Sequence, residues 1–381
     1  ALATALTGQP PSPVPVDLET IHGLQAVQGL RADPGPLRDF VPVRVLRRME
    51  HHIRIALLAA FDALGDAERR GVGHRGRLGI VMATGYGATC NSFDFQHLAT
   101  DTDDFSGSPT QFSNSVHNAA AAYLSIALEE NGPNHTVSHY DLSVPMALTV
   151  AAQWLAEDRV DSVLLGAVDE FSKAQAYAWQ QRVAKDPAAA SLPAIGEGAC
   201  ALLLSRARGG ETTDGISAAS EACHNAKAVG AASGAGAAGG ACHNANAVGA
   251  ASGAGAAGGA CHNANAVGAY ATIDAVGIGR RSASRQLPDL PASDLYLLGA
   301  DGFEGRDKDY AAVLPANCRA AAYPHIYGVL PVGMAFDVAI AALSLDAGQD
   351  FTGADLPDMS EVLVAAAGKS RHKRTESCCC L

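Results

Sequence analysis

The sequence has few charged residues, a deficit of basic ones and no long uninterrupted apolar run. Charged residues make up 17% of the 381 positions and hydrophobic ones 48%, which excludes a disordered polyelectrolyte. No run of about 18 or more apolar residues occurs without a polar interruption, so we expect no transmembrane helix. The first residues lack the basic segment of a secretory signal and resemble a chain that starts inside a longer one. We therefore expect a cytoplasmic location.

The shortage of basic residues limits the kind of partner. Lysine and arginine together number 27 against 39 aspartate and glutamate, which gives a formal net charge of −12. A surface this acidic repels phosphate backbones and anionic lipids. We therefore expect neither nucleic acid nor a membrane surface as the main partner.

Cysteines are present, but in positions that do not suit a disulfide framework. There are nine of them, and an odd number cannot pair completely. A chain of this length also needs no disulfides for stability, so we interpret them as reduced thiols. The terminal CCCL superficially fits a prenylation box, but nothing else indicates lipidation and we interpret it as a tail.

Apolar patterns along the first half predict alternating strands and helices. Helical spacing is seen in residues 45–64, 115–128 and 143–156, and short apolar or β-branched runs predict strands at 78–84, 136–139 and 161–167. The second half repeats this order, with strands at 198–205, 270–277, 294–299 and 361–366 and a helix at 333–345. We expect the strands 198–205 and 270–277 to be antiparallel neighbours. Alternation of this kind predicts an α/β fold with covered sheets and an internal duplication.

A 19-residue unit, ACHNANAVGAASGAGAAGG, recurs between the two strands at 198–205 and 270–277. The repeat lacks the large apolar side chains that a stacked solenoid would bury. Its Cys-His pairs are adjacent, whereas zinc ligands are usually separated by two to four residues. We interpret it as a low-complexity insertion without chemistry, rather than a metal site.

Residues 108–171 carry the most specific pattern, and together with two later segments they resemble the β-ketoacyl synthase family of the thiolase superfamily. An Asn118 helix, a Gly132-Pro133 turn, a strand and a buried helix follow in the family's order. Gly196-Glu197-Gly198-Ala199 and residues 327–333 match later family segments. The resemblance implies a thiolase-like, duplicated αβαβα five-layer fold with mixed sheets. The implied division is 1–210 and 269–367 for the two ketosynthase-like halves, 211–268 for the repeat and 368–381 for a tail.

The catalytic positions of that family are not occupied by catalytic residues. A condensing ketosynthase needs a thiolate at the start of a buried helix and two histidines for decarboxylation. The nucleophile position falls on Asp141, and the histidine positions fall on Asp301 and Val329. The family's lysine falls near Pro324. Asp141 cannot form the acyl thioester, and we expect its carboxylate to cap the helix that follows.

The loss of all three groups makes the chain similar to the chain-length-factor subunits of type II polyketide synthases. The resemblance implies a protein inactive alone, paired with a catalytic ketosynthase in a heterodimer and reached by an acyl carrier protein. It implies no cofactor and no metal. The SPT-F-S-SVHN pattern in residues 108–118 favours a polyene or aryl-polyene pathway.

The family's interface pocket aligns with residues 111–118, which we expect to form a strand leading into a helix. Side-chain volume in such a slot sets the length of the growing chain, because each displaced methylene costs about 1 kcal/mol. The bulky candidates are Phe112, Val116 and His117. Gln111, Asn114 and Asn118 complete the segment. Ordinary packing is the alternative for all of them.

Three other functions fit parts of the sequence. A stand-alone acyltransferase or hydrolase would use Ser138, His139, Asp141 or Ser143, although Ser138 and His139 point to opposite faces of a strand. A decarboxylating loading ketosynthase would keep the histidines. A carrier-binding module without a partner is disfavoured by the acidic surface. A dinucleotide site at Gly85-Tyr86-Gly87 is not supported, because no G-x-G-x-x-G follows.

Overall fold

The computed structural model describes residues 2, 6, 11–20, 23–74, 76–101, 108–185, 193–206, 227–228, 258–262, 272–277, 290, 293–299, 310–315, 318–348, 351 and 377–380. The first part of the chain contains β1 (Val14–Thr20), β2 (Gly23–Leu30), η1 (Gly35–Asp39), α2 (Val43–Leu46), α3 (His51–Arg69), β3 (Leu78–Thr84), α4 (Thr89–Asp101), α5 (Pro109–Ser115), α6 (Ala119–Leu128), β4 (Asn134–Ser138), η2 (Tyr140–Leu142), α7 (Ser143–Ala156), β5 (Ser162–Asp169), α8 (Lys173–Lys185), β6 (Ile195–Gly196) and β7 (Gly198–Ser205). The second part contains β8 (Lys227–Ala228), β9 (Gly258–His262), β10 (Thr272–Gly277), β11 (Leu295–Leu297), β12 (Ala320–Ala321), α11 (Pro324–Tyr327), α12 (Gly333–Ala347) and β13 (Ser377–Cys380).

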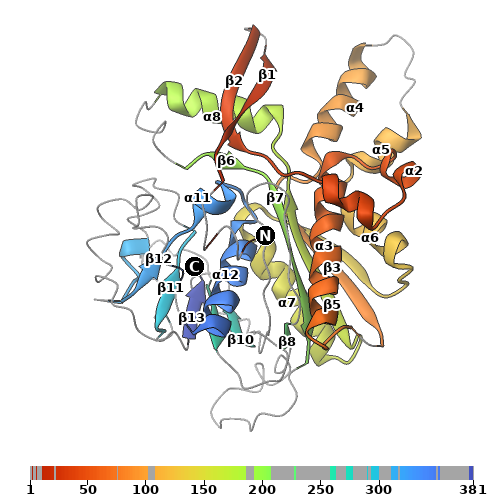
Figure 1. Ribbon diagram of the computed structural model, residues 1–381. Helices are drawn as coiled ribbons and strands as arrows, with labels where there is room; N and C mark the ends of the chain where they lie inside the picture. Colours follow the sequence, from red (N-terminus) through yellow and green to blue (C-terminus); the bar gives the residue numbers. More distant parts are fainter. Residues whose placement is uncertain are drawn as a thin grey trace.

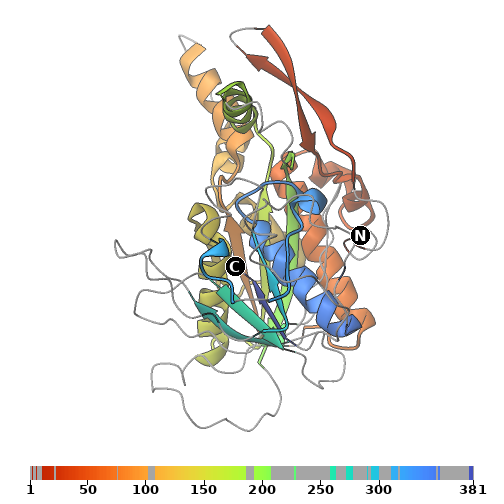
Figure 2. The ribbon, with the colours of Figure 1, turned by 90° about the vertical axis from the view of Figure 1, so that its left-hand side faces the viewer.

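The first sheet has the strand order β4-β3-β5-β7-β8 and forms the centre of the mixed α/β fold. Its strands β4, β3 and β5 are parallel, and β7 runs antiparallel to β5. Every residue of β3 and β5 is buried, which explains their continuous apolar sequences. Helices α3 and α7 lie on opposite sides of this sheet (Figure 2).

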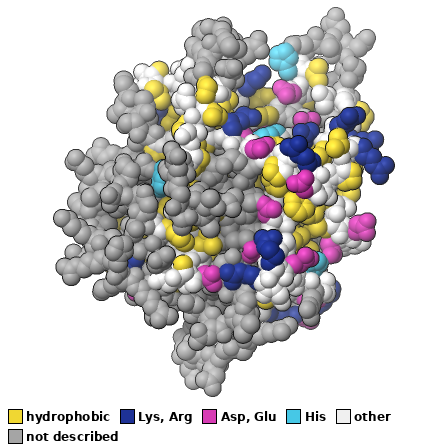
Figure 3. Space-filling view, viewed as in Figure 1, with side chains coloured by type: hydrophobic (Ala, Val, Ile, Leu, Met, Phe, Trp, Pro, Cys, Tyr) yellow, Lys and Arg dark blue, Asp and Glu magenta, His cyan; other side chains and the backbone are white. Residues whose placement is uncertain are grey.

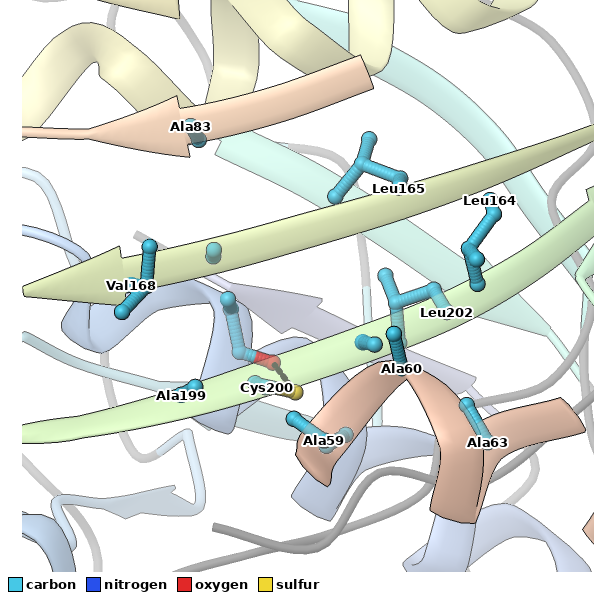
Figure 4. Packing of buried hydrophobic residues seen from close by; sticks show 14 of the residues in the cluster. Ala59, Ala60, Ala63, Ala83, Leu164, Leu165, Val168, Ala199, Cys200 and Leu202 are labelled. Atoms are coloured by element: carbon cyan, nitrogen blue, oxygen red, sulfur yellow. Dashed lines mark hydrogen bonds between the residues drawn. The ribbon is translucent and has the colours of Figure 1, made fainter. Parts of the chain in front are cut away.

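Alanines on α3 allow this helix to approach the sheet closely. Ala59, Ala60 and Ala63 are buried against β7, near Cys200 and Leu202 (Figure 4). Larger side chains at these positions would force the helix away from the strand, at a cost of about 1–3 kcal/mol for each overpacked site. The alanines of α3 therefore lie where the helix packs against the sheet.

A second sheet has the order β10-β9-β13-β11-β12. Helix α12 contacts β7 of the first sheet and both β9 and β13 of the second, and α7 contacts β10. These two helices therefore join the sheets. A hairpin of β1 and β2 extends from the body beside α8 (Figure 1), and β2 continues into a pairing with β6.

Two expectations about the elements are wrong. The strands 198–205 and 270–277 are not neighbours, because β7 pairs with β5 and β8 while β10 pairs with β9 in the other sheet. The interface segment is not a strand leading into a helix, because residues 109–115 form the helix α5. The expected strand at 361–366 lies outside the described residues. Short strands β8 and β9 fall within the repeat region 211–268.

Candidate functional site

The site lies where the parallel strands β4, β3 and β5 end together. Thr84 at the end of β3 is in register with Ser138 at the end of β4, and Asp169 ends β5 next to them. Loops that leave the carboxyl ends of parallel strands carry binding sites in many α/β proteins. The predicted nucleophile position and the loop after β3 both belong to this edge.

A sharp turn, η2, connects β4 to the buried helix α7. Tyr140 in this turn has φ = 48°, a left-handed conformation that costs a non-glycine residue about 1 kcal/mol. Asp141 follows it and is exposed. The helix cap predicted for Asp141 is wrong, because Leu142 occupies the cap position and no side chain bonds to the end of the helix. The intervening turn holds Asp141 one residue too early.

The side chain of Ser143, the first residue of α7, holds this turn in shape through hydrogen bonds. Its side chain is buried, and its Oγ accepts a hydrogen bond from the His139 amide at 2.8 Å. The hydroxyl proton is shared between the carbonyl oxygens of Thr84, at 2.9 Å, and Tyr140, at 2.7 Å. Because these contacts use the hydroxyl fully, Ser143 is a structural residue and is poorly suited to act as a nucleophile.

The loop after β3 is held by the carboxylate of Asp169. This carboxylate accepts hydrogen bonds from Thr84 Oγ1 at 2.9 Å and from the amides of Gly85, at 3.0 Å, and Tyr86, at 2.9 Å. Complete burial raises the pKa of Asp169 to about 6, although the hydrogen bonds favour the ionised form. The ring of Tyr86 meets that of Tyr140 edge to face, with centroids 5.9 Å apart. Asp169 thereby connects β5 to the turn that carries Asp141.

A loop from the second half reaches the same edge. The amide of Val329 donates to the Ala194 carbonyl at 2.9 Å, and the Gly196 amide donates to the Val329 carbonyl at 3.2 Å. Two residues later Pro331 packs so tightly on Gly85 that a Cβ there would clash with its ring. Glycine is required at position 85 for this close approach.

The three residues predicted to stand at catalytic positions of the family are therefore placed unequally. The turn bearing Asp141 and the loop bearing Val329 both lie next to the Gly85–Gly87 loop, through the Tyr86–Tyr140 and Gly85–Pro331 contacts. Asp301 lies outside the described residues. Val329, predicted to stand at a histidine position of the family, has an apolar side chain that cannot itself transfer a proton.

The predicted pocket segment is mostly on the surface. Phe112 is 58% exposed and Val116 is 37% exposed. Gln111 is half-buried and Asn118 is exposed. The ring of Phe112 lies 5.6 Å from that of Phe95 on α4. Large apolar side chains this exposed are available to a partner surface.

Two other residues of the segment have structural contacts. Asn114 is buried and donates from Nδ2 to the carbonyl oxygen of Arg48 at 2.9 Å, which ties α5 to the start of α3. The imidazole of His117 lies against Gly87, where any side chain would clash with it. Gly87 also has φ = 68°, so both its conformation and its neighbour require glycine.

A buried glutamate from the Gly-Glu-Gly-Ala motif was not singled out as a site residue by sequence reasoning. Glu197 Oε1 accepts from the Ala32 amide at 2.9 Å and from His51 Nε2 at 2.7 Å, and it pairs with Arg31 Nε at 3.2 Å. Its other oxygen accepts from the Phe171 amide at 2.9 Å. His51 and Arg31 lower the pKa of Glu197 against the effect of burial. The motif was the available signal, but its partners lie far away in the sequence.

Other titratable groups beside Glu197 are buried or half-buried, and their pKa values are shifted toward the neutral forms. Glu170 accepts from the Cys90 amide at 2.8 Å, and burial together with this carboxylate raises the pKa of the Cys90 thiol. Burial lowers the pKa of His52 to about 4, helped by the nearby His117 and His51. A thiol with a raised pKa is a poor nucleophile. Within the described ranges, no group of three or more His, Cys, Asp or Glu side chains is arranged to hold a metal ion.

None of the described helices is both long and apolar enough to cross a bilayer.

No curated protein matches the sequence. Among solved structures, the ishigamide ketosynthase/chain length factor is similar with a TM-score of 0.56 at 20% identity, covering 88% of this chain and 83% of that one.

Two further structures are similar over shorter ranges. The ketosynthase ApeO in complex with its chain length factor ApeC from Xenorhabdus doucetiae gives a TM-score of 0.34 at 22% identity, covering 44% of this chain and 63% of that one. A β-ketoacyl synthase from Burkholderia phymatum STM815 gives 0.42 at 17% identity, covering 53% of each chain. The family described as β-ketoacyl synthase, N-terminal domain, matches residues 25–239, more than half of the sequence. The chain belongs to the β-ketoacyl synthase family.

Proposed function

We propose that this protein is a non-catalytic chain-length-factor subunit. It would pair with a catalytic ketosynthase and shape the acyl pocket of that subunit while a carrier-bound polyketide chain is elongated. The observation that carries the proposal is the turn before α7, in which a strained Tyr140 and the Ser143 hydrogen bonds present Asp141, a carboxylate, at the position predicted for the nucleophile. We propose that the scaffold of a condensing enzyme is retained here without its reactive group.

The chemistry of Asp141 supports an inactive subunit. A ketosynthase first moves the acyl chain from a carrier thioester to its own cysteine thiolate, and an exposed carboxylate cannot form that thioester. Decarboxylation of the extender unit needs positioned histidines, and Val329 provides none. Asp301 is proposed, from the sequence alone, to stand at the first of the two histidine positions, and Val329 at the second. We therefore propose no turnover by this chain alone.

An exposed apolar face next to the turn supports a partner subunit. Tyr86 and Tyr140 are 39% and 64% exposed, and Phe112 and Val116 are also exposed. Contacts connect these residues. The ring of Tyr86 meets that of Tyr140, and Gly87, the residue after Tyr86, lies against His117, the residue after Val116. Obligate interfaces bury apolar surfaces of this kind. We propose that a ketosynthase subunit covers this face.

Within this interface, we propose that residues 111–118 adjust the depth of the partner's pocket. Phe112 and Val116 project from the segment, whereas Asn114 anchors it to Arg48. A rigid segment with exposed bulky tips suits a role in which side-chain volume limits an acyl chain. Gln111, His117 and Asn118 flank these tips.

A local basic surface supports contact with an acyl carrier protein through the complex. Despite the net charge of −12, Arg44, Arg47 and Arg48 are all exposed around α2. Figure 3 shows basic side chains gathered over this part of the molecule. Carrier proteins are acidic, so such a patch would attract one to an otherwise acidic subunit.

The finer parts of the proposal rest on the sequence. They are a polyene-type or aryl-polyene-type product, a complete five-layer αβαβα duplication, the division into residues 1–210, 211–268, 269–367 and 368–381, and a cytoplasmic location. The helices α7 and α12 between the two sheets support the duplication, because each contacts both sheets. Each of these points is independent of the proposed pairing with a ketosynthase and can be tested separately.

Co-expression with a catalytic ketosynthase encoded in the same genome tests the role directly. We expect a stoichiometric complex on size-exclusion chromatography, and products only when the ketosynthase cysteine is intact. Asp141→Asn should leave complex formation and turnover unchanged. Turnover of acyl thioesters by the isolated chain, abolished by Asp141→Asn or Ser143→Ala, would instead establish a stand-alone acyltransferase or hydrolase.

A further inference from the structure

A buried tyrosine–carboxyl pair lies immediately behind the loop that carries Val329. Tyr327 ends α11 and Asp337 lies in α12, and both side chains are completely or almost completely buried. The Tyr327 hydroxyl donates a hydrogen bond to Asp337 Oδ1 at 2.8 Å. The second oxygen, Oδ2, is buried, and no hydrogen-bond partner for it is found among the residues that the structure describes. A buried carboxylate with one donor is poorly solvated, so this arrangement requires an explanation.

The Tyr327–Asp337 pair joins the two ends of the loop of residues 328–332, because Tyr327 precedes the loop and Asp337 lies in the helix that follows it. The Tyr327 ring stacks on Phe336 with centroids 5.1 Å apart, and it also contacts Gly333 at the start of α12. The carbonyl of Tyr327 touches Gly196 so closely that a Cβ there would clash with it. Movement of Tyr327 would therefore disturb the contacts that its loop makes with residues 194–196.

Beyond its base, the loop contacts the site at two places. Val329 exchanges backbone hydrogen bonds with Ala194 and Gly196, and Pro331 covers Gly85. Gly85 is in turn held by Asp169. The position of the loop therefore determines how the second half of the chain closes over the edge at which Asp141 lies.

The titratable groups around the pair are few among the described residues. Cys200 faces Asp337 from β7, while Tyr310 and Cys380 of β13 face Tyr327. Burial raises the pKa of Asp337 to about 7 and keeps Tyr327 in its hydroxyl form by raising its pKa as well. Asp169, with a pKa of about 6, is the titratable group beneath the tip of the loop.

We propose that Tyr327 and Asp337 form a proton-dependent latch, which holds residues 328–331 against Gly85 and Gly196 when the carboxyl is protonated and loosens when it ionises. Ionisation leaves a charge with a single donor in an apolar helix contact, and opening of the loop would let water reach it. The latch goes beyond the proposed partner role, because it operates in the isolated chain.

The sign of the pH dependence follows from the raised pKa. Since the carboxyl binds a proton more tightly when docked than its ordinary value of 3.8 implies, docking is strongest in acid. It weakens as the pH rises toward about 7, and it changes little above that value. Between pH 6 and pH 8 the opening equilibrium should increase about tenfold, most of it below pH 7.

Hydrogen exchange on the full chain tests the latch. Protection factors of peptides that contain Gly196 and Val329 should fall about tenfold from pH 6 to pH 8. Peptides that contain Leu164 and Leu203, paired in the core of the first sheet, report global opening, which the same ionisation also favours, so the reference is their higher absolute protection at each pH. Loop protection that does not fall between pH 6 and pH 8, or that equals the protection of these core peptides at each pH, would contradict the latch, and this result needs no variant.

Two variants assign the effect to the pair. Asp337→Asn keeps an acceptor for Tyr327 but cannot ionise, so its loop protection should be independent of pH between 6 and 8. Tyr327→Phe should lower protection at every pH while the pH dependence persists. Asp346→Asn, at the partly exposed end of the same helix, is the matched control and should behave like the unmodified chain. An unchanged pH dependence in Asp337→Asn would overturn the proposal.

Discussion

Two buried carboxylates hold the two loops that meet at the site, and they are solvated very differently. Asp169 receives three donors from the loop after β3, whereas Asp337 receives only the Tyr327 hydroxyl. Both are completely buried, and burial raises the pKa of each, to about 6 for Asp169 and to about 7 for Asp337. The larger number of donors on Asp169 favours its ionised form, which Asp337 lacks the contacts to stabilise to the same degree.

The comparison indicates different tasks for the two halves of the site. A carboxylate with several amide donors fixes a loop rigidly, because each donor would otherwise be buried without a partner. A carboxyl group with one donor makes a weaker contact, which can open at a lower cost in free energy. The half that carries Asp141 is therefore rigid, and the half that carries Val329 is able to respond to its surroundings.

Removal of the Asp169 carboxylate should have the largest effect. Asp169→Ala leaves Thr84 Oγ1 and the amides of Gly85 and Tyr86 buried without an acceptor, at a total cost of roughly 5 kcal/mol. Urea unfolding followed by circular dichroism measures this loss. Asp94→Ala, an exposed aspartate on α4, should change stability by less than about 0.5 kcal/mol. Similar losses in both variants would show that Asp169 does not anchor the loop.

The second largest expected effect is the change in unfolding free energy with pH that Asp337 causes. Because burial raises the pKa of Asp337 from 3.8 to about 7, its contribution is full below the lower value and is lost as the pH rises through the upper one. Between pH 5 and pH 8 the unfolding free energy should lose about 3 kcal/mol from this group. The same urea titration on Asp337→Asn should lack that loss.

Asp169 provides the comparison within that experiment. Its pKa of about 6 places most of its own loss at lower pH, so Asp169→Asn should flatten the profile mainly below pH 6. Identical profiles for the two asparagine variants would remove the distinction between the rigid and the adjustable loop.

Ser143→Ala should have a moderate effect, about 2 kcal/mol. It leaves the His139 amide without its acceptor and the carbonyl oxygens of Thr84 and Tyr140 without the hydroxyl that bonds to them. Thermal unfolding of the isolated chain measures the change. Ser113→Ala on α5, whose hydroxyl bonds only locally to Thr110, is a control expected to be near neutral. Equal effects of the two substitutions would argue against a fixed turn.

Elements that are largely buried could be predicted from the sequence alone. The strand 78–84, the helix 143–156 and the strand 198–205 were predicted with their observed bounds. Each is a continuous run of apolar or small residues, which needs no knowledge of its neighbours. The helix start at 115 was wrong because α5 ends there and α6 begins only at Ala119.

The contacts that build the site could not be predicted in this way. Asp169 reaches Gly85 across 84 residues, and His51 reaches Glu197 across 146. Pairing of β7 with β8 instead of β10 likewise depends on which strand lies beside β7 in space, which the local sequence does not specify. The sequence predicts Asp141 as an altered catalytic position, but the strained turn that presents it depends on a contact of Ser143 with the distant carbonyl of Thr84.

The smallest change in stability should accompany the largest change in function, at Phe112. Phe112→Ala removes an exposed ring, so the isolated chain should lose less than about 0.5 kcal/mol. In the ketosynthase complex the same change should lengthen the products, because the space that the ring occupies becomes available to the acyl chain. Product analysis by mass spectrometry measures this, with Phe93→Ala on α4, 51% exposed, as the matched control. Unchanged product lengths in an intact complex would remove Phe112 from the pocket, and the rigid half of the site would then serve only to support the interface.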